Sequence, residues 1–139
     1  MARLGLEALI NTWVRTGSAR PGRKVLTLVA AMIAGATNID QANIVRAGAT
    51  QTVLPFKVMA PSTIGTFLRS FTFGHVRQLD AVLSRVLGRA WAAGAGPGDK
   101  ELVVDFDSTI CEVYGKHKQG TGYGYTKVLG YHPRGGAFR

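Results

Sequence analysis

The feature that most constrains this chain is an apolar segment at 102–114, which carries two aspartates two positions apart. Because side chains alternate along a strand, Asp105 and Asp107 share one face, and both faces begin with apolar residues. We therefore expect a strand covered on both sides. At least one carboxylate then lies near the interior, where it needs a cation, hydrogen bonds or a metal ion. The spacing also fits an aspartate that ends the strand and caps a turn with Ser108 and Thr109.

Seven short sequence motifs occur one after another along the chain. They are PGRKVLT at 21–27, RAGAT at 46–50, APSTIGTFLRSF at 60–71, DFDST at 105–109, EVYG at 112–115, GTGYGYT at 120–126 and GYHP at 130–133. Together they resemble the amino-terminal part and the start of the catalytic domain of prokaryotic insertion-sequence transposases of the DDE type. The resemblance covers nearly the whole chain, and the order of several unrelated words makes it specific.

The resemblance implies a ribonuclease-H-like sheet in which three acidic residues hold two divalent metal ions, Mg²⁺ or Mn²⁺, for in-line attack on a phosphodiester. The residue that matches the first catalytic aspartate of the family is Asp107, which is therefore the expected catalytic and metal-binding residue. We expect Asp105 to support it from the same face of the strand, and Thr109 to orient a ligand.

The chain departs from the family pattern after this motif. No Asp or Glu follows Glu112, so the second and third acidic residues are missing. On a continuous strand Glu112 faces away from Asp107 and cannot replace them. Beyond Pro133 the residues at 134–139 no longer follow the pattern, as expected of a truncation or a frame change. Whether the chain is an enzyme therefore stays open: we expect a transposase fragment in DNA transposition that is inactive alone. The alternative is a non-catalytic nucleic-acid-binding module, or a regulator of an intact transposase.

The pattern divides the chain into three regions. Residues 1–22 are expected to form a helix and a flexible tether, and 23–96 a helical, DNA-binding region that ends in a Gly- and Ala-rich segment. Residues 97–139 are expected to be the incomplete start of a DDE catalytic domain, a β-hairpin of strands 102–114 and 123–131. The expected fold class is α+β: a helical amino-terminal region followed by the first hairpin of a truncated ribonuclease-H-like domain.

The charge balance favours a polyanionic partner. Seventeen Lys and Arg oppose eight Asp and Glu, which gives a formal charge of +9, and Lys and Arg contacts with phosphates release counterions. A generally basic soluble protein remains the simpler explanation of net charge alone. The candidate DNA-binding residues are Arg69, Arg77, Arg85, Arg89, Lys116, Lys118 and Lys127. The expected partner is double-stranded DNA at insertion-sequence ends, and a homo-oligomer is left open.

Two helices of the middle region have clear apolar periodicity. The helix at 24–35 carries a stripe from Val25 to Ile33 that we expect to pack in the core. The helix at 75–93 carries a second stripe, and its arginines should form a basic ridge on the other side. Two shorter helices precede this long one, but the stretch at 48–60 is longer than the turn of a helix-turn-helix motif. Another all-helical DNA-binding arrangement is therefore preferred.

The remaining features concern location. Cys111 is the only cysteine, which excludes an internal disulfide and a Cys-rich zinc site. The longest apolar run, at 25–34, is too short to span a bilayer. We therefore expect a cytoplasmic protein without a membrane partner.

Overall fold

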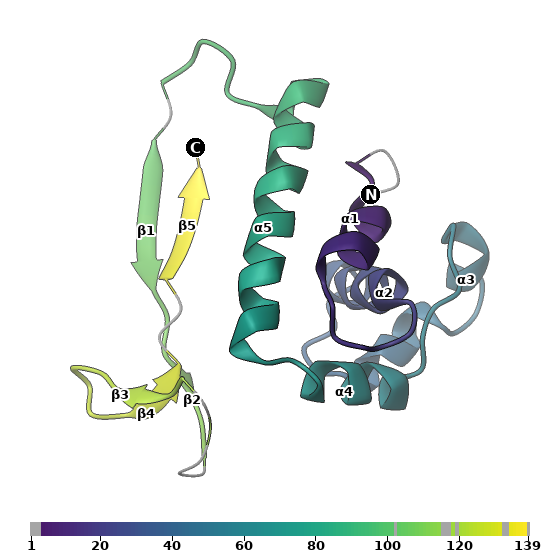
Figure 1. Ribbon diagram of the computed structural model, residues 1–139, viewed down its shortest axis with the longest axis horizontal. Coiled ribbons are helices and arrows are strands. Elements are labelled where there is room, and N and C mark those ends of the chain that lie inside the picture. The colour runs from purple at the N-terminus through teal and green to yellow at the C-terminus, as the bar shows by residue number, and fades with distance from the viewer. Residues whose placement is uncertain (1–3, 102, 115–117, 119, 132–133, 139) are drawn as a thin grey trace. The chain divides into compact units, whose positions relative to one another are not determined.

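The computed structural model describes residues 4–101, 103–114, 118, 120–131 and 134–138, of which 105–108 and 134–138 are described as backbone only. The chain divides into two compact units, Met1–Gly96 and Pro97–Arg139, which we call the helical unit and the strand unit (Figure 1). The fold class is α+β, because helices build the first unit and antiparallel strands the second.

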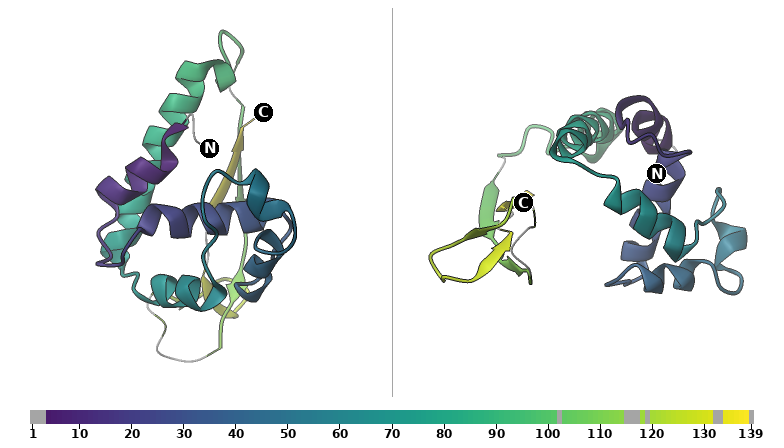
Figure 2. Two further views of the ribbon diagram at one scale, coloured as in Figure 1. Left: turned by 90° about the vertical axis from the view of Figure 1, so that its right-hand side faces the viewer. Right: turned by 60° about the horizontal axis from the view of Figure 1, so that its bottom comes forward.

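The helical unit is a packed group of helices. Its elements are α1 (Leu6–Trp13), α2 (Pro21–Ile33), the 3₁₀ helix η2 (Asp40–Val45), α3 (Thr50–Val53), α4 (Pro61–Arg69), α5 (Phe73–Ala90) and η3 (Trp91–Ala95). α1 lies against both α2 and α5, and α4 lies against α2 and η2 (Figure 1 and Figure 2). Both α2 and α4 begin with proline, whose fixed φ suits the first helical turn.

The core of the helical unit consists of two clusters. One joins α2 to η2 through Ala30, Ala31, Ala42, Val45 and Val58, and the other joins α1 to α5 through Leu9, Ile10, Val14 and Val82. The expected helix at the start of the chain is α1, and its described residues pack against α2 and α5. Burial of α1 side chains makes this segment part of the helical unit.

α2 buries a different face from the one that periodicity predicted. Met32 and Ile33, at the end of the expected stripe, are exposed, whereas Lys24, Thr27 and Ala31 are buried. The reason is that α1, η2 and α4 all contact this helix, so more than one side is covered. Thr27 is accommodated by hydrogen bonds: its Oγ1 donates to the Arg23 carbonyl at 2.9 Å and accepts the Met59 N–H at 3.1 Å.

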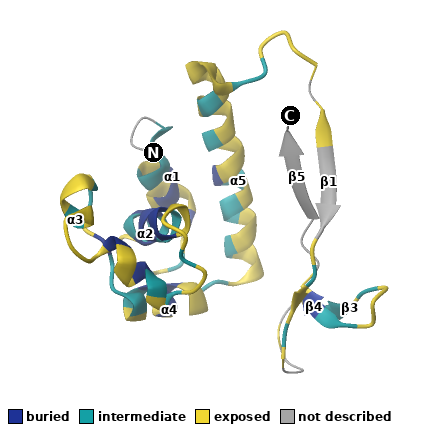
Figure 3. Ribbon diagram, turned by 180° about the vertical axis from the view of Figure 1, so that it is seen from behind, coloured by how far each residue is buried: buried dark blue, intermediate teal, exposed yellow. Residues whose placement is uncertain are grey.

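α5 is the longest helix of the described chain and is covered on one side only. Val82 is its single buried residue, with Leu79 and Val86 partly buried beside it (Figure 3). Its first turn is tied to the segment after α1, because the Thr72 N–H donates to Nδ1 of His75, and Nε2 of the same ring lies 3.0 Å from the Arg15 carbonyl oxygen.

The strand unit contains five short strands in two antiparallel sheets. They are β1 (Val104–Ser108), β2 (Cys111–Glu112), β3 (Gly122–Tyr123), β4 (Leu129–Tyr131) and β5 (Arg134–Phe138), in the orders β1-β5 and β2-β4-β3. The expected single strand at 102–114 is interrupted after Ser108. In the expected partner segment at 123–131, β4 pairs with both β2 and β3. β1 pairs with β5, in a segment where no strand was expected.

Candidate functional site

The acidic motif lies on β1. In the antiparallel register with β5, Asp105 stands opposite Ala137 and Asp107 stands opposite Gly135. The side chains of the two aspartates lie outside what the structure describes. Gly135 and Ala137 have no side-chain donor atoms, so the facing positions of β5 add no metal ligand. Thr109 follows directly after the strand and is exposed.

The family resemblance implies three carboxylates, and in this sequence no Asp or Glu follows Glu112 to supply the second and third. Among the described residues, no group of three or more His, Cys, Asp and Glu could hold a metal ion. Glu112 is exposed on β2 and pairs with Gly130 across the sheet. The strand is interrupted at 109–110, between β1 and β2. Alternation along one strand therefore does not determine whether Glu112 and Asp107 point to the same side.

Positive charge is concentrated in the helical unit. That unit contains eleven Lys and Arg but only three Asp and Glu, whereas the strand unit contains six and five. Across the described residues one salt bridge forms, between Arg23 Nε and Glu7 Oε1 at 3.2 Å. Most basic side chains of the helical unit are thus not neutralised by a carboxylate within hydrogen-bonding distance.

Two of the arginines expected on the outer ridge of α5 face α1 instead. The Arg85 guanidinium lies 3.7 Å from the centroid of the Trp13 ring, and its Nη1 donates to the Ala81 carbonyl at 2.8 Å. Arg89 Nη1 donates to the Leu4 carbonyl at 2.9 Å. These contacts join α5 to the first helix. The signal in the sequence was the aromatic residue at the end of α1, which can accept a cation on its ring face.

Arg69 and Arg77 lie on either side of the short connection at 70–72 that joins α4 to α5. Both are exposed, and the one close polar contact recorded for either side chain is Arg69 Nη2 to Thr66 Oγ1 at 3.4 Å. An aromatic series stabilises the connection: the Phe71 ring lies 5.0 Å from Phe67 and 5.7 Å from His75. A short turn therefore joins α4 and α5, whereas the segment considered for such a turn in the sequence, 48–60, precedes α4.

The candidate lysines of the strand unit are not gathered on one element. Lys127 is exposed in the turn between β3 and β4, where it adopts a left-handed φ of 58°. Lys118 is exposed near the start of β3. Lys116 lies outside the described residues.

Lys24 is a buried cation that sequence reasoning missed. It is 7% exposed, its ammonium donates to Ser18 Oγ, and it lies 5.4 Å from the centroid of the Phe67 ring. Its hydroxyl and ring contacts assign it to the packing between the start of α2 and α4. Nothing in the sequence indicated that Lys24 is buried, because a lysine at the start of a helix is usually exposed to solvent.

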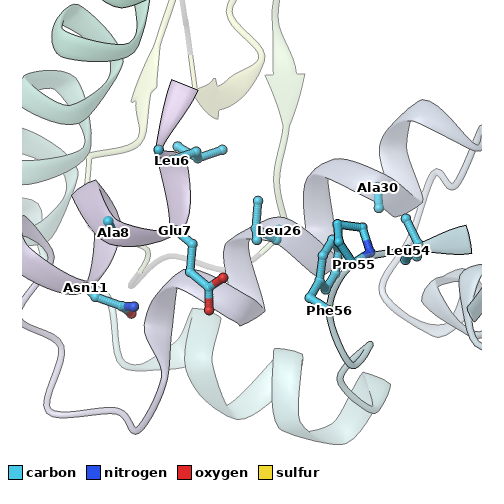
Figure 4. A pocket seen from close by; sticks show the side chains of 10 residues that line it. Leu6, Glu7, Ala8, Asn11, Leu26, Ala30, Leu54, Pro55 and Phe56 are labelled. Carbon is cyan, nitrogen blue, oxygen red and sulfur yellow. The ribbon is translucent and has the colours of Figure 1, made fainter. Parts of the chain in front are cut away.

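A pocket of about 700 Å³ opens between α1, α2 and the segment at 54–56 (Figure 4). Its lining is largely apolar. The two polar side chains in it are already engaged, because Glu7 pairs with Arg23 and Asn11 Oδ1 accepts the Gly22 N–H at 2.9 Å. The pocket therefore presents no arrangement of nucleophile, base and acid.

Comparison with models of known protein families, with curated proteins and with solved structures finds no match for the chain. None of the described helices combines the length and the apolar character needed to cross a membrane.

Proposed function

We propose that this chain is part of a DDE-type transposase in which the helical unit binds double-stranded DNA at insertion-sequence ends and β1 carries the first catalytic aspartate, Asp107. The observation that supports this most is the charge of the helical unit. It contains eleven basic and three acidic residues, and one ion pair forms among the described residues. Uncompensated Lys and Arg side chains bind phosphates and release counterions.

The catalytic part of the proposal rests on the sequence resemblance at 105–109. Asp107 is assigned to the metal position, where Mg²⁺ or Mn²⁺ would take hard oxygen ligands, and Asp105 and Thr109 to supporting positions. The resemblance places the second and third acidic residues after the first motif, and no Asp or Glu of this sequence follows Glu112. We therefore propose that the chain by itself binds DNA without cutting it. Its strand unit would be the incomplete start of the ribonuclease-H-like domain that the resemblance implies.

Salt-dependent DNA binding tests the proposal. Fluorescence anisotropy with a labelled duplex gives the slope of log affinity against log salt for the full chain and for the double variant Arg69→Gln, Arg77→Gln. Each lost phosphate contact should reduce the magnitude of the slope by about 0.9, so the double variant should lose roughly 2 and bind more weakly at every salt concentration.

Lys100→Gln is the control, since it removes an exposed positive charge that is not assigned to DNA. Its slope should match that of the unmodified chain. An unchanged slope in the Arg69 and Arg77 variant would remove these residues from the interface, and salt-independent binding by the parent would refute the proposal as a whole.

The alternative function is a non-catalytic module that competes with an intact transposase for DNA. The lack of Asp and Glu after Glu112 in the sequence supports this alternative. A metal-dependent nicking assay separates the two: we expect no cleavage by this chain, and cleavage that disappears in Asp107→Ala would show that the chain is itself catalytic.

A further inference from the structure

One side of the three-stranded sheet β2-β4-β3 carries two exposed tyrosines (Figure 1). Residues that stand directly opposite each other in an antiparallel pair point to the same side of the sheet. The register places Tyr123 of β3 opposite Leu129 of β4. Tyr131 is two positions after Leu129 on β4, so alternation puts its side chain on that side too. We call this side the tyrosine face. Tyr123 is 74% exposed there and Tyr131 is 37% exposed.

The charges around this sheet favour an anionic partner. The one acidic residue of the three strands, Glu112, pairs with Gly130 and therefore points to the side opposite the tyrosine face. Lys118 precedes β3, Lys127 lies in the turn that follows it, and both are exposed. In the sequence no acidic side chain occurs after Glu112, whereas five Lys and Arg do. The rings are thus bracketed along the chain by positive charge, and no carboxylate of these strands shares their side.

We infer that the tyrosine face binds single-stranded DNA, with bases stacked on Tyr123 and Tyr131 and with Lys118 and Lys127 near the phosphates. Bases of any identity stack on an aromatic ring, and basic side chains beside the rings hold the backbone of the strand. Tyr125 follows β3 and is 89% exposed, so it offers a further ring at the end of this strand.

The spacing of the two rings selects an unpaired strand over a duplex. Tyr123 and Tyr131 are diagonal neighbours on adjacent strands, because Tyr131 is two positions beyond Leu129. Such neighbours lie about 7–8 Å apart, which is about twice the 3.4 Å between successive nucleotides of one strand of B-DNA. Successive bases therefore reach both rings only when they are unstacked from each other. In a duplex the base faces are covered by the neighbouring pairs, so the rings cannot stack on them.

This inference goes beyond the proposed function, which assigns duplex DNA to the helical unit. It rests on that function for the choice of DNA over RNA, since rings and lysines by themselves suit either. Arg69 and Arg77, which the duplex experiment varies, belong to the helical unit and take no part in the tyrosine face. The two proposals can therefore fail separately.

Anisotropy of a labelled thymidine strand of about eight nucleotides tests the stacking. The measurement is made with the full chain at about 0.3 M salt, where phosphate contacts contribute less. Tyr123→Leu keeps an apolar side chain but removes the ring, and should weaken binding by about 5- to 150-fold. Tyr123→Phe keeps the ring and should bind like the parent. Absence of binding by the parent, or equal affinity of the parent and the leucine variant, would overturn the inference.

Two controls separate the ring from other effects. Tyr114→Leu removes a ring that is 81% exposed, two residues beyond Glu112 and so out of phase with the tyrosine face, and should leave the affinity unchanged. A strand of the same length without bases keeps the phosphates, and should bind weakly and equally to the parent and to Tyr123→Leu. Hydrogen exchange at the Val113 amide, which donates to the Leu129 carbonyl, verifies the sheet in each variant. Equal losses in the two leucine variants would overturn the inference.

Duplex and RNA ligands define the partner. Tyr123→Leu should bind duplex DNA like the parent, and equal weakening on duplex and single strand would overturn the assignment to unpaired DNA. A uridine strand that binds the parent more tightly than the thymidine strand would overturn the choice of DNA. Single-strand binding that depends on Tyr123, in a parent that does not bind duplex, would support the tyrosine face and refute the proposed function.

Photocrosslinking tests the contact in the unmodified chain, without a substitution that could disturb the sheet. A thymidine strand carrying iodouracil is irradiated with the protein, and the crosslinked peptides are identified by mass spectrometry. We expect crosslinks at Tyr123 or Tyr131, because iodouracil couples to an aromatic ring that is stacked on it. Crosslinks confined to the helical unit would overturn the inference.

Discussion

The helical unit and the strand unit differ in how much of their structure is protected from water. In the helical unit Ile64 and Thr27 are completely buried, and two clusters of buried side chains connect its helices. In the described part of the strand unit the large side chains are mostly exposed, as at Tyr114, Tyr123 and Tyr125. Short paired strands without a covered face gain little from the hydrophobic effect. The helical unit therefore has its own core, whereas the strand unit depends mainly on backbone pairing.

The two units also divide the charge and the motif between them. Eleven basic and three acidic residues lie in the helical unit, while the strand unit, with six and five, carries the acidic strand. Under the proposed function, the helical unit would attract phosphates and the strand unit, with its small core, would carry the acidic motif. Three substitutions test how far the contrast holds.

The largest effect is expected for Phe67→Ala in the helical unit. Phe67 is 1% exposed and contacts both the Phe71 ring and the Lys24 ammonium. Removing a buried aromatic side chain leaves a cavity, so the free energy of unfolding should fall by about 3–5 kcal/mol in urea titrations followed by circular dichroism. Tyr125→Ala is the control in the strand unit: that ring is 89% exposed, and its loss should change stability by less than about 0.5 kcal/mol. Similar losses in both variants would remove the contrast between the units.

A smaller and local effect is expected for Gly130→Ala on β4. A Cβ at this position would lie 2.7 Å from the Cys111 carbonyl oxygen of the neighbouring strand, so the backbone must shift. The opening free energy of the β2-β4 pair should fall by about 1–3 kcal/mol. Hydrogen exchange at the Val113 amide, which donates to the Leu129 carbonyl, measures this directly, while helical amides should be unaffected.

Gly122→Ala on β3 is the matched control, because a Cβ there has no neighbouring heavy atom within 4 Å. Exchange at Val113 should be unchanged in this variant. Faster exchange throughout the helical unit in Gly130→Ala would contradict the view that the strands open independently.

The smallest effect is expected for Arg85→Gln, which removes the cation from the Trp13 ring. A cation–π pair at a partly exposed site contributes about 0.5–1 kcal/mol, and the helical unit should be destabilised by that amount in urea titrations at low protein concentration. Arg77→Gln removes the same charge from the same helix at an exposed side chain that does not lie on the Trp13 ring, and should leave stability unchanged. Equal effects would mean that charge, and not the ring contact, is responsible.

Local sequence signals predicted the helices and the α+β class well. Apolar periodicity indicated α2 and α5, prolines marked helix starts, and the Gly- and Ala-rich segment before Pro97 coincides with the division between the units. These features depend on neighbouring residues, whose effects on the backbone are short-ranged. For the candidate site, the sequence predicted only the motif at 105–109 and the strand that carries it. It did not predict which residues lie next to that strand.

Contacts between distant residues decided the remainder. β5 is a strand because β1 pairs with it, although Gly135 and Gly136 have little strand preference of their own. The docking of Arg85 on Trp13 and the burial of Lys24 beside Phe67 depend on which helices meet. The sequence alone thus determined which segments are helical, where positive charge accumulates and which strand carries the aspartates. The tertiary structure decided which helix faces are covered and which arginines remain free, because burial depends on neighbours that only the folded chain brings together.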